Sequence, residues 1–185
     1  MGGAGGRHKA AIRGDRHRLR RRRRPVPQLG ALPASRALIP VVVLSGGAAT
    51  TLRRLAATAY PDEGCGVLVG TVEDGSVSVV EVTSGRNLVG DRSRDRYELD
   101  PAAIVLAERR ARGAGLDVVG FWHSHPDHPA RPSPLDSERA WPDYAYLIVA
   151  VAAGVAVDLR AYSLPDSGGE LTERGLRIDA AAPAA

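Results

Sequence analysis

The sequence predicts an α/β domain in which helices flank a curved, mostly antiparallel sheet. Apolar runs of strand length alternate with longer segments that have the apolar periodicity of helices. Two of the strand-like runs, 66–72 and 77–82, are separated only by residues 73–76, whose Glu-Asp-Gly-Ser composition is typical of a hairpin turn. Because strands joined by a tight turn run antiparallel, this pair favours an antiparallel sheet.

The first part of the domain is predicted to consist of a strand at 38–44 and a helix at 48–60. Pro61 ends the helix, because proline lacks a backbone N–H and its ring clashes with the preceding turn. The residues expected to share the buried face of this helix are Leu52, Leu55 and Ala59.

The second part begins with a polar stretch at 86–96 that has no apolar period, so we expect a long loop or flap. Asp100 is suited to cap a second helix, with Pro101 at its first position, that runs to about residue 113. The other predicted elements are a strand at 116–122, a short helix from Pro134, and strands at 144–151 and 155–162.

Positive charge is concentrated at the start of the chain. Residues 1–36 contain 11 Lys and Arg residues and one acid, whereas the remaining 149 residues contain 14 basic and 20 acidic residues. The first segment has five consecutive arginines with scattered Gly and Pro, so it cannot bury enough apolar surface to offset its ordering entropy. We therefore predict a basic, disordered tail at 1–36, one folded domain at 37–180 and a frayed end at 181–185.

An arginine-rich tail is also a candidate arm for nucleic acid or for an acidic partner. The tail, however, lacks the interleaved aromatic residues of a stacking platform, and a chain with 24 arginines and one lysine has the bias of GC-rich coding. Nucleic-acid binding is therefore not the main expectation.

The composition favours a cytoplasmic protein. No apolar run approaches the ~20 residues that a membrane span needs, and residues 37–44 fail as a signal peptide because they are short and contain Pro40. A single cysteine, Cys65, suits a reducing compartment.

A His-x-His pair lies at the end of the strand predicted at 116–122. Alternate side chains of a strand share a face, so we expect His123 and His125 to project together. Zinc prefers imidazole nitrogen and carboxylate oxygen in a tetrahedral shell, and Asp136 is the nearest candidate for a third ligand. Such a set would leave a fourth position for water, as in catalytic sites. An isolated His-x-His pair is more often two ordinary surface or core histidines.

The segment from Ser133 to Asp136 also has a purely structural interpretation. Ser133 is suited to be a helix N-cap, with Pro134 at the first helical position and Asp136 at the third. The structural and the metal-binding interpretations are compatible, because a capped helix start would hold Asp136 rigidly.

A second metal pattern overlaps the first. Residues 123–128 spell His-x-His-x-Asp-His, the first signature of the metallo-β-lactamase superfamily. That superfamily needs further histidine ligands downstream, and no histidine follows His128. The chain therefore lacks the ligands for a site of that type.

A longer pattern joins the histidine pair to the region near residue 63. It consists of Glu63 within the run 60–70, His123, Ser124 and His125, and then Ser133 and Asp136 after intervals of seven and two residues. This pattern resembles that of the JAMM (MPN+) zinc metallopeptidases, with every motif position filled, and the resemblance covers roughly residues 37–165. It implies the MPN/JAB-like fold, a strongly bent sheet between helices of the cytidine-deaminase-like type.

The resemblance also implies a role for each residue, and residue chemistry supports the same roles. Zinc, which the resemblance assigns to His123, His125 and Asp136, lowers the pKa of bound water to about 7. Glu63 is the natural group to carry the proton from water to the leaving amine, and Ser133 could donate a hydrogen bond to the oxyanion. Without the histidine pair, Glu63 would be interpreted as an ordinary surface acid.

The remaining candidates have simpler interpretations. Cys65 is expected to be a small buried residue and not a nucleophile, because the histidines that could activate it serve the metal. His128 is expected in a solvated loop near the site, with a supporting role as the alternative. Trp122 and Trp141 are expected in core or rim packing, and Ser124 is expected to face the interior of the sheet.

For the substrate, only the resemblance is informative. JAMM enzymes cleave amide bonds after the C-terminal glycines of ubiquitin-like proteins, and small stand-alone bacterial members similar to this chain act on sulfur-carrier proteins of the ThiS/MoaD type. The resemblance thus implies a Zn²⁺-dependent hydrolase of peptide or isopeptide bonds. The alternative is a non-catalytic MPN scaffold or interaction module, although such domains have lost ligands that this chain retains.

Overall fold

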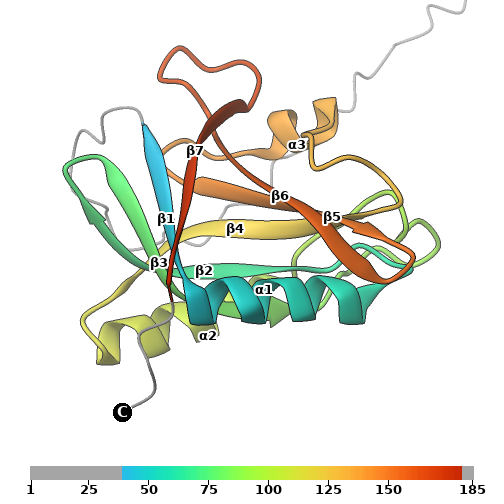
Figure 1. Ribbon diagram of the computed structural model, residues 1–185, viewed down its shortest axis with the longest axis horizontal. Helices are drawn as coiled ribbons and strands as arrows, with labels where there is room; N and C mark the ends of the chain where they lie inside the picture. The colour runs from blue at the N-terminus through green and yellow to red at the C-terminus, as the bar shows by residue number, and fades with distance from the viewer. Residues whose placement is uncertain (1–38, 181–185) are drawn as a thin grey trace, which may run out of the picture. The chain divides into compact units, whose positions relative to one another are not determined.

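The strands of the domain form one sheet that closes on itself in the order β1-β3-β2-β4-β5-β6-β7. The structure is a computed structural model, and it describes residues 39–180 (Figure 1). The tails predicted at 1–36 and 181–185 lie outside the described residues. The elements are β1 (Val41–Ser45), α1 (Gly46–Ala59), β2 (Cys65–Glu73), β3 (Ser76–Gly85), α2 (Pro101–Gly113), β4 (Asp117–Pro126), α3 (Pro134–Arg139), β5 (Ala145–Ala152), β6 (Val155–Ser163) and β7 (Thr172–Asp179).

Antiparallel pairing predominates in this sheet. Among the described residues, β2 pairs antiparallel with β3 and β4, and β6 pairs antiparallel with β5 and β7. The three parallel pairings are β1 with β3, β1 with β7, and β4 with β5. The predicted class, an α/β fold with a curved and mostly antiparallel sheet flanked by helices, is confirmed.

The helix α1 begins two residues before its predicted start, because Ser45 caps it. The Ser45 side chain accepts a hydrogen bond of 3.2 Å from the backbone N–H of Ala48, which satisfies one of the free donors at the helix start. Leu52 is buried as predicted, but Ala56 is the other fully buried residue of the last two turns, while Leu55 and Ala59 are half-buried.

The strand β7 was missed by the sequence analysis. It has few apolar side chains and is largely exposed, so no alternation of apolar residues marks it. Its backbone pairs with β1 on one side and β6 on the other, and these pairings close the sheet. Backbone hydrogen bonds, rather than burial of side chains, therefore specify this strand.

The main core lies between α1 and the strands that it contacts. α1 contacts β1, β3, β5, β6 and β7, and in the view of Figure 1 it lies on the side of the strands opposite to α3. The large side chains of this core include Val42, Leu44, Leu52, Leu68, Trp122, Leu147 and Val149.

Among the described residues, no helix combines the length and the apolar character that crossing a membrane would require.

Candidate metal centre

His123 and His125 lie on β4, which the adjacent strands β2 and β5 hold on both edges. His123 is paired with Cys65 of β2 and with Ile148 of β5. The strand continues to Pro126, four residues beyond its predicted end, so both histidines lie within regular structure. The alternation of a strand puts them on the face opposite to Trp122, and they are 1% and 9% exposed.

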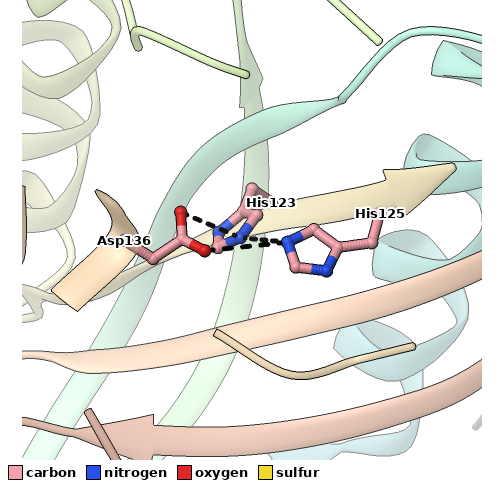
Figure 2. Close-up of side chains that lie close together, drawn as sticks. All are labelled: His123, His125 and Asp136. Atoms are coloured by element: carbon pink, nitrogen blue, oxygen red, sulfur yellow. Dashed lines mark hydrogen bonds and ion pairs between the residues drawn. The ribbon is translucent and has the colours of Figure 1, made fainter. Parts of the chain in front are cut away.

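The two imidazoles and one carboxylate converge on a common point. The Nε2 atoms of His123 and His125 are 3.0 Å apart. One carboxylate oxygen of Asp136 lies 3.6 Å from the Nε2 of His123, and the other lies 3.8 Å from the Nε2 of His125. Figure 2 shows the carboxylate directed at both rings. Among the described residues, these three side chains form a group whose ligand atoms all lie within 4.8 Å of one another.

Asp136 is held in place by the first turn of α3. The backbone N–H of Ser133 donates to one carboxylate oxygen of Asp136 at 2.6 Å, and the Oγ of Ser133 accepts from the backbone N–H of Asp136 at 3.2 Å. This reciprocal capping box, with Pro134 following the cap, confirms the predicted helix start. The carboxylate is thus fixed before any ligand arrives.

Outer contacts orient the two rings. The Nδ1 of His125 lies 2.8 Å from the carbonyl oxygen of Pro129, so Nδ1–H donates to it and the lone pair of Nε2 faces Asp136. The ring of Tyr97 stacks on that of His123, with centroids 4.5 Å apart. The Nδ1 of His123 is buried and has no hydrogen-bond partner within residues 39–180.

For two of the three side chains, His123 and Asp136, the electrostatics favour the protonation state that a metal ligand needs. Burial lowers the pKa of His123, which keeps this imidazole neutral. Burial would raise the pKa of Asp136, but its contacts with His123, His125 and Ser133 outweigh this effect and hold the pKa well below its usual range. For His125, burial lowers the pKa, but Asp136 and the Pro129 carbonyl outweigh it, and the pKa is raised.

This donor set fits zinc. Zinc binds nitrogen and oxygen ligands at about 2.0–2.2 Å in a tetrahedral shell, which puts neighbouring ligand atoms about 3.3 Å apart. The three observed separations, 3.0, 3.6 and 3.8 Å, lie on both sides of that value. The hydrogen bond to Pro129 is also the kind of outer contact that metal-binding histidines make.

Glu63 lies beside the histidine pair although 60 residues separate it from His123 in the sequence. The backbone N–H of Gly64 donates to the Oγ of Ser124 at 2.8 Å, and the backbone N–H of Ser124 donates to the carbonyl of Gly64 at 2.9 Å. Extending this antiparallel register by one residue puts Glu63 opposite His125. Ser124 is fully buried, as predicted for the residue between the two histidines.

The carboxyl group of Glu63 has the properties of a proton carrier at neutral pH. Glu63 is only 7% exposed, and this burial raises its pKa to about 7. The charge on His125 lowers the pKa, whereas those on Asp136 and Asp95 raise it further. A group with a pKa near the working pH can both accept and donate a proton, which general acid–base catalysis requires.

The other predicted residues take the positions that their chemistry suggests. Ser133 is exposed beside Asp136, and its hydroxyl accepts the cap hydrogen bond while its own hydrogen remains available. Burial raises the pKa of Cys65 to about 12, so its thiol is inert. Trp122 is a core residue that donates to the carbonyl of Thr83, and His128 is exposed in a loop.

Several residues at this site were missed by the sequence analysis. Asn87 belongs to the stretch 86–96, for which only a loop or flap was predicted, and Tyr97 lies directly after that stretch. The carbonyl of Pro129 was missed because a backbone group carries no signature in the sequence. Asn87 is the single asparagine of the chain, but nothing in the sequence indicates its contacts.

Comparison with known proteins places this site within a known domain. The family model described as prokaryotic homologs of the JAB domain (Prok-JAB) matches residues 47–164. That range includes Glu63, both histidines, Ser133 and Asp136.

Three curated proteins are similar to the chain. Desampylase of Haloferax volcanii is 44% identical over 89 residues, which cover 48% of this chain and 62% of the relative. The probable TtuB-protein conjugate cleaving protease of Thermus thermophilus is 34% identical over 70 residues, covering 38% of this chain and 44% of the relative. The CysO-cysteine peptidase of Mycobacterium tuberculosis is 31% identical over 121 residues, which cover 64% of this chain and 78% of the relative. The chain thus spans less than two thirds of the first two relatives.

Two solved structures are similar to the fold. A protein of Desulfitobacterium hafniense has a TM-score of 0.66 and 27% identity, and the match covers 77% of this chain and 95% of that one. A protein of Salinibacter ruber has a TM-score of 0.57 and 38% identity, with 76% and 93% covered.

Proposed function

Because the chain belongs to the family of prokaryotic homologs of the JAB domain, we propose that it is a zinc-dependent peptidase. Its proposed reaction is hydrolysis of the peptide or isopeptide bond after the C-terminal Gly-Gly of a ubiquitin-like sulfur-carrier protein. The observation that carries this proposal is the convergence of His123, His125 and Asp136 beside the buried carboxyl group of Glu63.

Each residue of the site has a chemical task in this reaction. His123, His125 and Asp136 would hold the zinc ion, which as a Lewis acid supplies a nucleophilic water and polarises the scissile carbonyl. Glu63 accepts the proton of the attacking water and passes it to the nitrogen of the leaving amine. The hydroxyl hydrogen of Ser133 donates to the oxyanion, an interaction worth about 2.7–4 kcal/mol where one such donor has been removed.

The proposed substrate class rests on the relatives and on backbone chemistry. The names of three similar proteins describe a desampylase, a protease that cleaves TtuB-protein conjugates and a peptidase for CysO-cysteine. A Gly-Gly tail offers no side chains, so an enzyme must recognise it through its backbone and through the narrow space that only glycine fits.

The substrate is tested by incubating the zinc-loaded protein with a sulfur-carrier protein that ends in Gly-Gly followed by one added residue. We expect intact mass to show loss of that residue and a carrier ending in Gly-Gly. The matched substrate ends in Ala-Ala before the same residue and should remain intact, because a Cβ atom hinders the close backbone approach that glycine permits. A carrier that stays uncleaved by a fully zinc-loaded protein would support the scaffold alternative instead.

The metal is tested by elemental analysis of the purified protein. We expect one zinc per chain, and we expect His123→Ala and His125→Ala to lose it, because each removes one of three converging ligands. His128→Ala is the matched control: it removes an exposed histidine three residues away and should retain one zinc. A wild-type protein that cannot take up added zinc would refute the metal assignment.

A further inference from the structure

Asn87 uses its complete hydrogen-bonding capacity. Its Nδ2 donates to the carbonyl oxygens of Glu63 at 3.2 Å and Arg96 at 3.1 Å. Its Oδ1 accepts from the backbone N–H groups of Val89 and Glu98, both at 3.0 Å. A side-chain amide has two donor hydrogens and two acceptor lone pairs, so these four contacts occupy all of them.

Two of these partners, Val89 and Glu98, lie at the base of a long loop, residues 86–100, which connects β3 to α2. The base is also closed by backbone hydrogen bonds from Leu88 to Glu98 at 2.8 Å and from Asp100 to Arg86 at 3.0 Å. Asn87 adds bonds on both sides of this base, to Val89 on one side and to Arg96 and Glu98 on the other. These contacts join the two ends of the loop, which contains no helix or named strand.

Residues of the same loop form hydrogen bonds with both the carbonyl and the N–H of Glu63. The carbonyl of Glu63 accepts from Asn87, and its N–H donates to the carbonyl of Ser93 at 2.6 Å. The neighbouring Asp62 accepts from the hydroxyl of Ser93 at 2.7 Å. Since Glu63 lies in the connection between α1 and β2, outside regular structure, these loop contacts hold its backbone together with the neighbouring pairing of Gly64 with Ser124.

The far end of the loop reaches the metal ligands. Tyr97 stacks on the ring of His123, and its carbonyl accepts from the guanidinium of Arg139 at 3.1 Å. Arg139 belongs to α3, whose first turn carries Asp136. The loop thus contacts the strand, the helix and the connection that together supply the site.

We propose that Asn87 is a positioning residue. It holds the base of the 86–100 loop together and thereby keeps Glu63 beside the pair His123 and His125. It touches no reacting atom and acts only through the backbone of Glu63 and the ring of Tyr97. This inference rests on the proposed peptidase function, because it assigns Asn87 to the geometry of that reaction. A misplacement of about 1 Å at a catalytic group can cost about a hundredfold in rate, so a lost anchor should be visible in kcat.

The test variant is Asn87→Asp, which is isosteric. It keeps the oxygen that accepts from Val89 and Glu98, and so keeps part of the loop closure. It replaces the donor to Glu63 and Arg96 with an oxygen that repels both carbonyls. We expect kcat to fall by about ten- to a hundredfold, KM to stay within about threefold, and one zinc per chain to remain.

Amide hydrogen exchange supplies a readout that needs no substrate. In Asn87→Asp, exchange should rise at residues 62–65 and 93–97, because the bonds from Asn87 to the Glu63 and Arg96 carbonyls are lost and the N–H of Glu63 then depends on Ser93 alone, while exchange in β4 and β5 stays unchanged. The matched control is Arg92→Ala, which removes an exposed ion pair with Asp95 within the same loop and should match wild type in exchange and in kcat. Asn87→Ala, which adds no charge, should repeat the pattern of Asn87→Asp.

The outcomes separate the two proposals. If the wild-type protein does not cleave the carrier, the proposed function fails, and exchange at Glu63 still decides whether Asn87 holds that segment. If the wild type cleaves but Asn87→Asp keeps its kcat or its exchange pattern, the positioning role is wrong. It is also wrong if both Asn87 variants unfold or lose zinc, since Asn87 would then serve the fold rather than the placement of Glu63.

Discussion

Replacing Glu63 with glutamine is expected to lower kcat by at least about a hundredfold while zinc and the fold persist, since general acid–base steps contribute about 10²–10⁴ in rate. Glutamine has nearly the same shape but cannot accept and return a proton. The hydrogen bonds that hold Glu63 run through its backbone, to Ser93 and Asn87, so they survive the substitution. Steady-state kinetics on a cleavable carrier protein would measure kcat. Elemental analysis and the melting temperature would show whether zinc and the fold persist.

Asp62→Asn is the matched control for Glu63→Gln. It changes the adjacent acid, which is exposed, and keeps an oxygen that accepts from Ser93. We expect its kcat to stay within about twofold of wild type, because no proton is carried there. If Glu63→Gln sheds zinc, Glu63 is a ligand or a structural support. If it keeps full activity together with zinc, another group carries the proton.

Replacing Asp136 with asparagine is expected to weaken the metal site itself. The neutral amide oxygen is a poorer zinc ligand than a carboxylate, while the backbone of Ser133 can still donate to it and preserve the helix cap. We expect zinc affinity to fall by at least about a hundredfold, the upper end of what loss of an outer contact costs. Activity should fall in parallel and recover in part when zinc is added in excess.

The zinc titration distinguishes this effect from that of Glu63→Gln, which added zinc should not rescue. Glu138→Gln is the matched control, because it neutralises an exposed acid on the same short helix and should bind zinc as wild type does. An Asp136→Asn protein with unchanged zinc affinity would remove Asp136 from the ligand set. A variant that loses both zinc affinity and helical structure would instead show that Asp136 acts mainly by capping α3.

The local parts of the site could be predicted from the sequence because their geometry depends on neighbours in the chain. Two residues apart on a strand is enough to bring His123 and His125 to one face. Ser133, Pro134 and Asp136 form a capping box through contacts within a single helical turn. The cap at Asp100 and the helix that begins at Pro101 were predicted for the same reason, whereas the end of β4, which depends on pairing with β2 and β5, was predicted four residues too early.

What the sequence could not specify depends on pairings between distant segments. The exchange of hydrogen bonds between Gly64 and Ser124 brings Glu63 to the histidines, and burial in the packed chain is the main cause that raises its pKa to about 7. The strand β7 was invisible for a related reason: its place depends on the open edges of β1 and β6, not on its own side chains.

The sequence by itself therefore determined which residues could bind a metal, since spacing, strand alternation and capping are properties of a few adjacent residues. Only the tertiary structure decided how these residues are completed into a site. The register of β2 and β4 places Glu63 opposite His125, and the 86–100 loop places the ring of Tyr97 against that of His123. The carbonyl of Pro129 orients the ring of His125. Each of these contacts joins groups whose approach is set by the folded backbone, and a backbone amide or carbonyl looks the same at every position of a sequence.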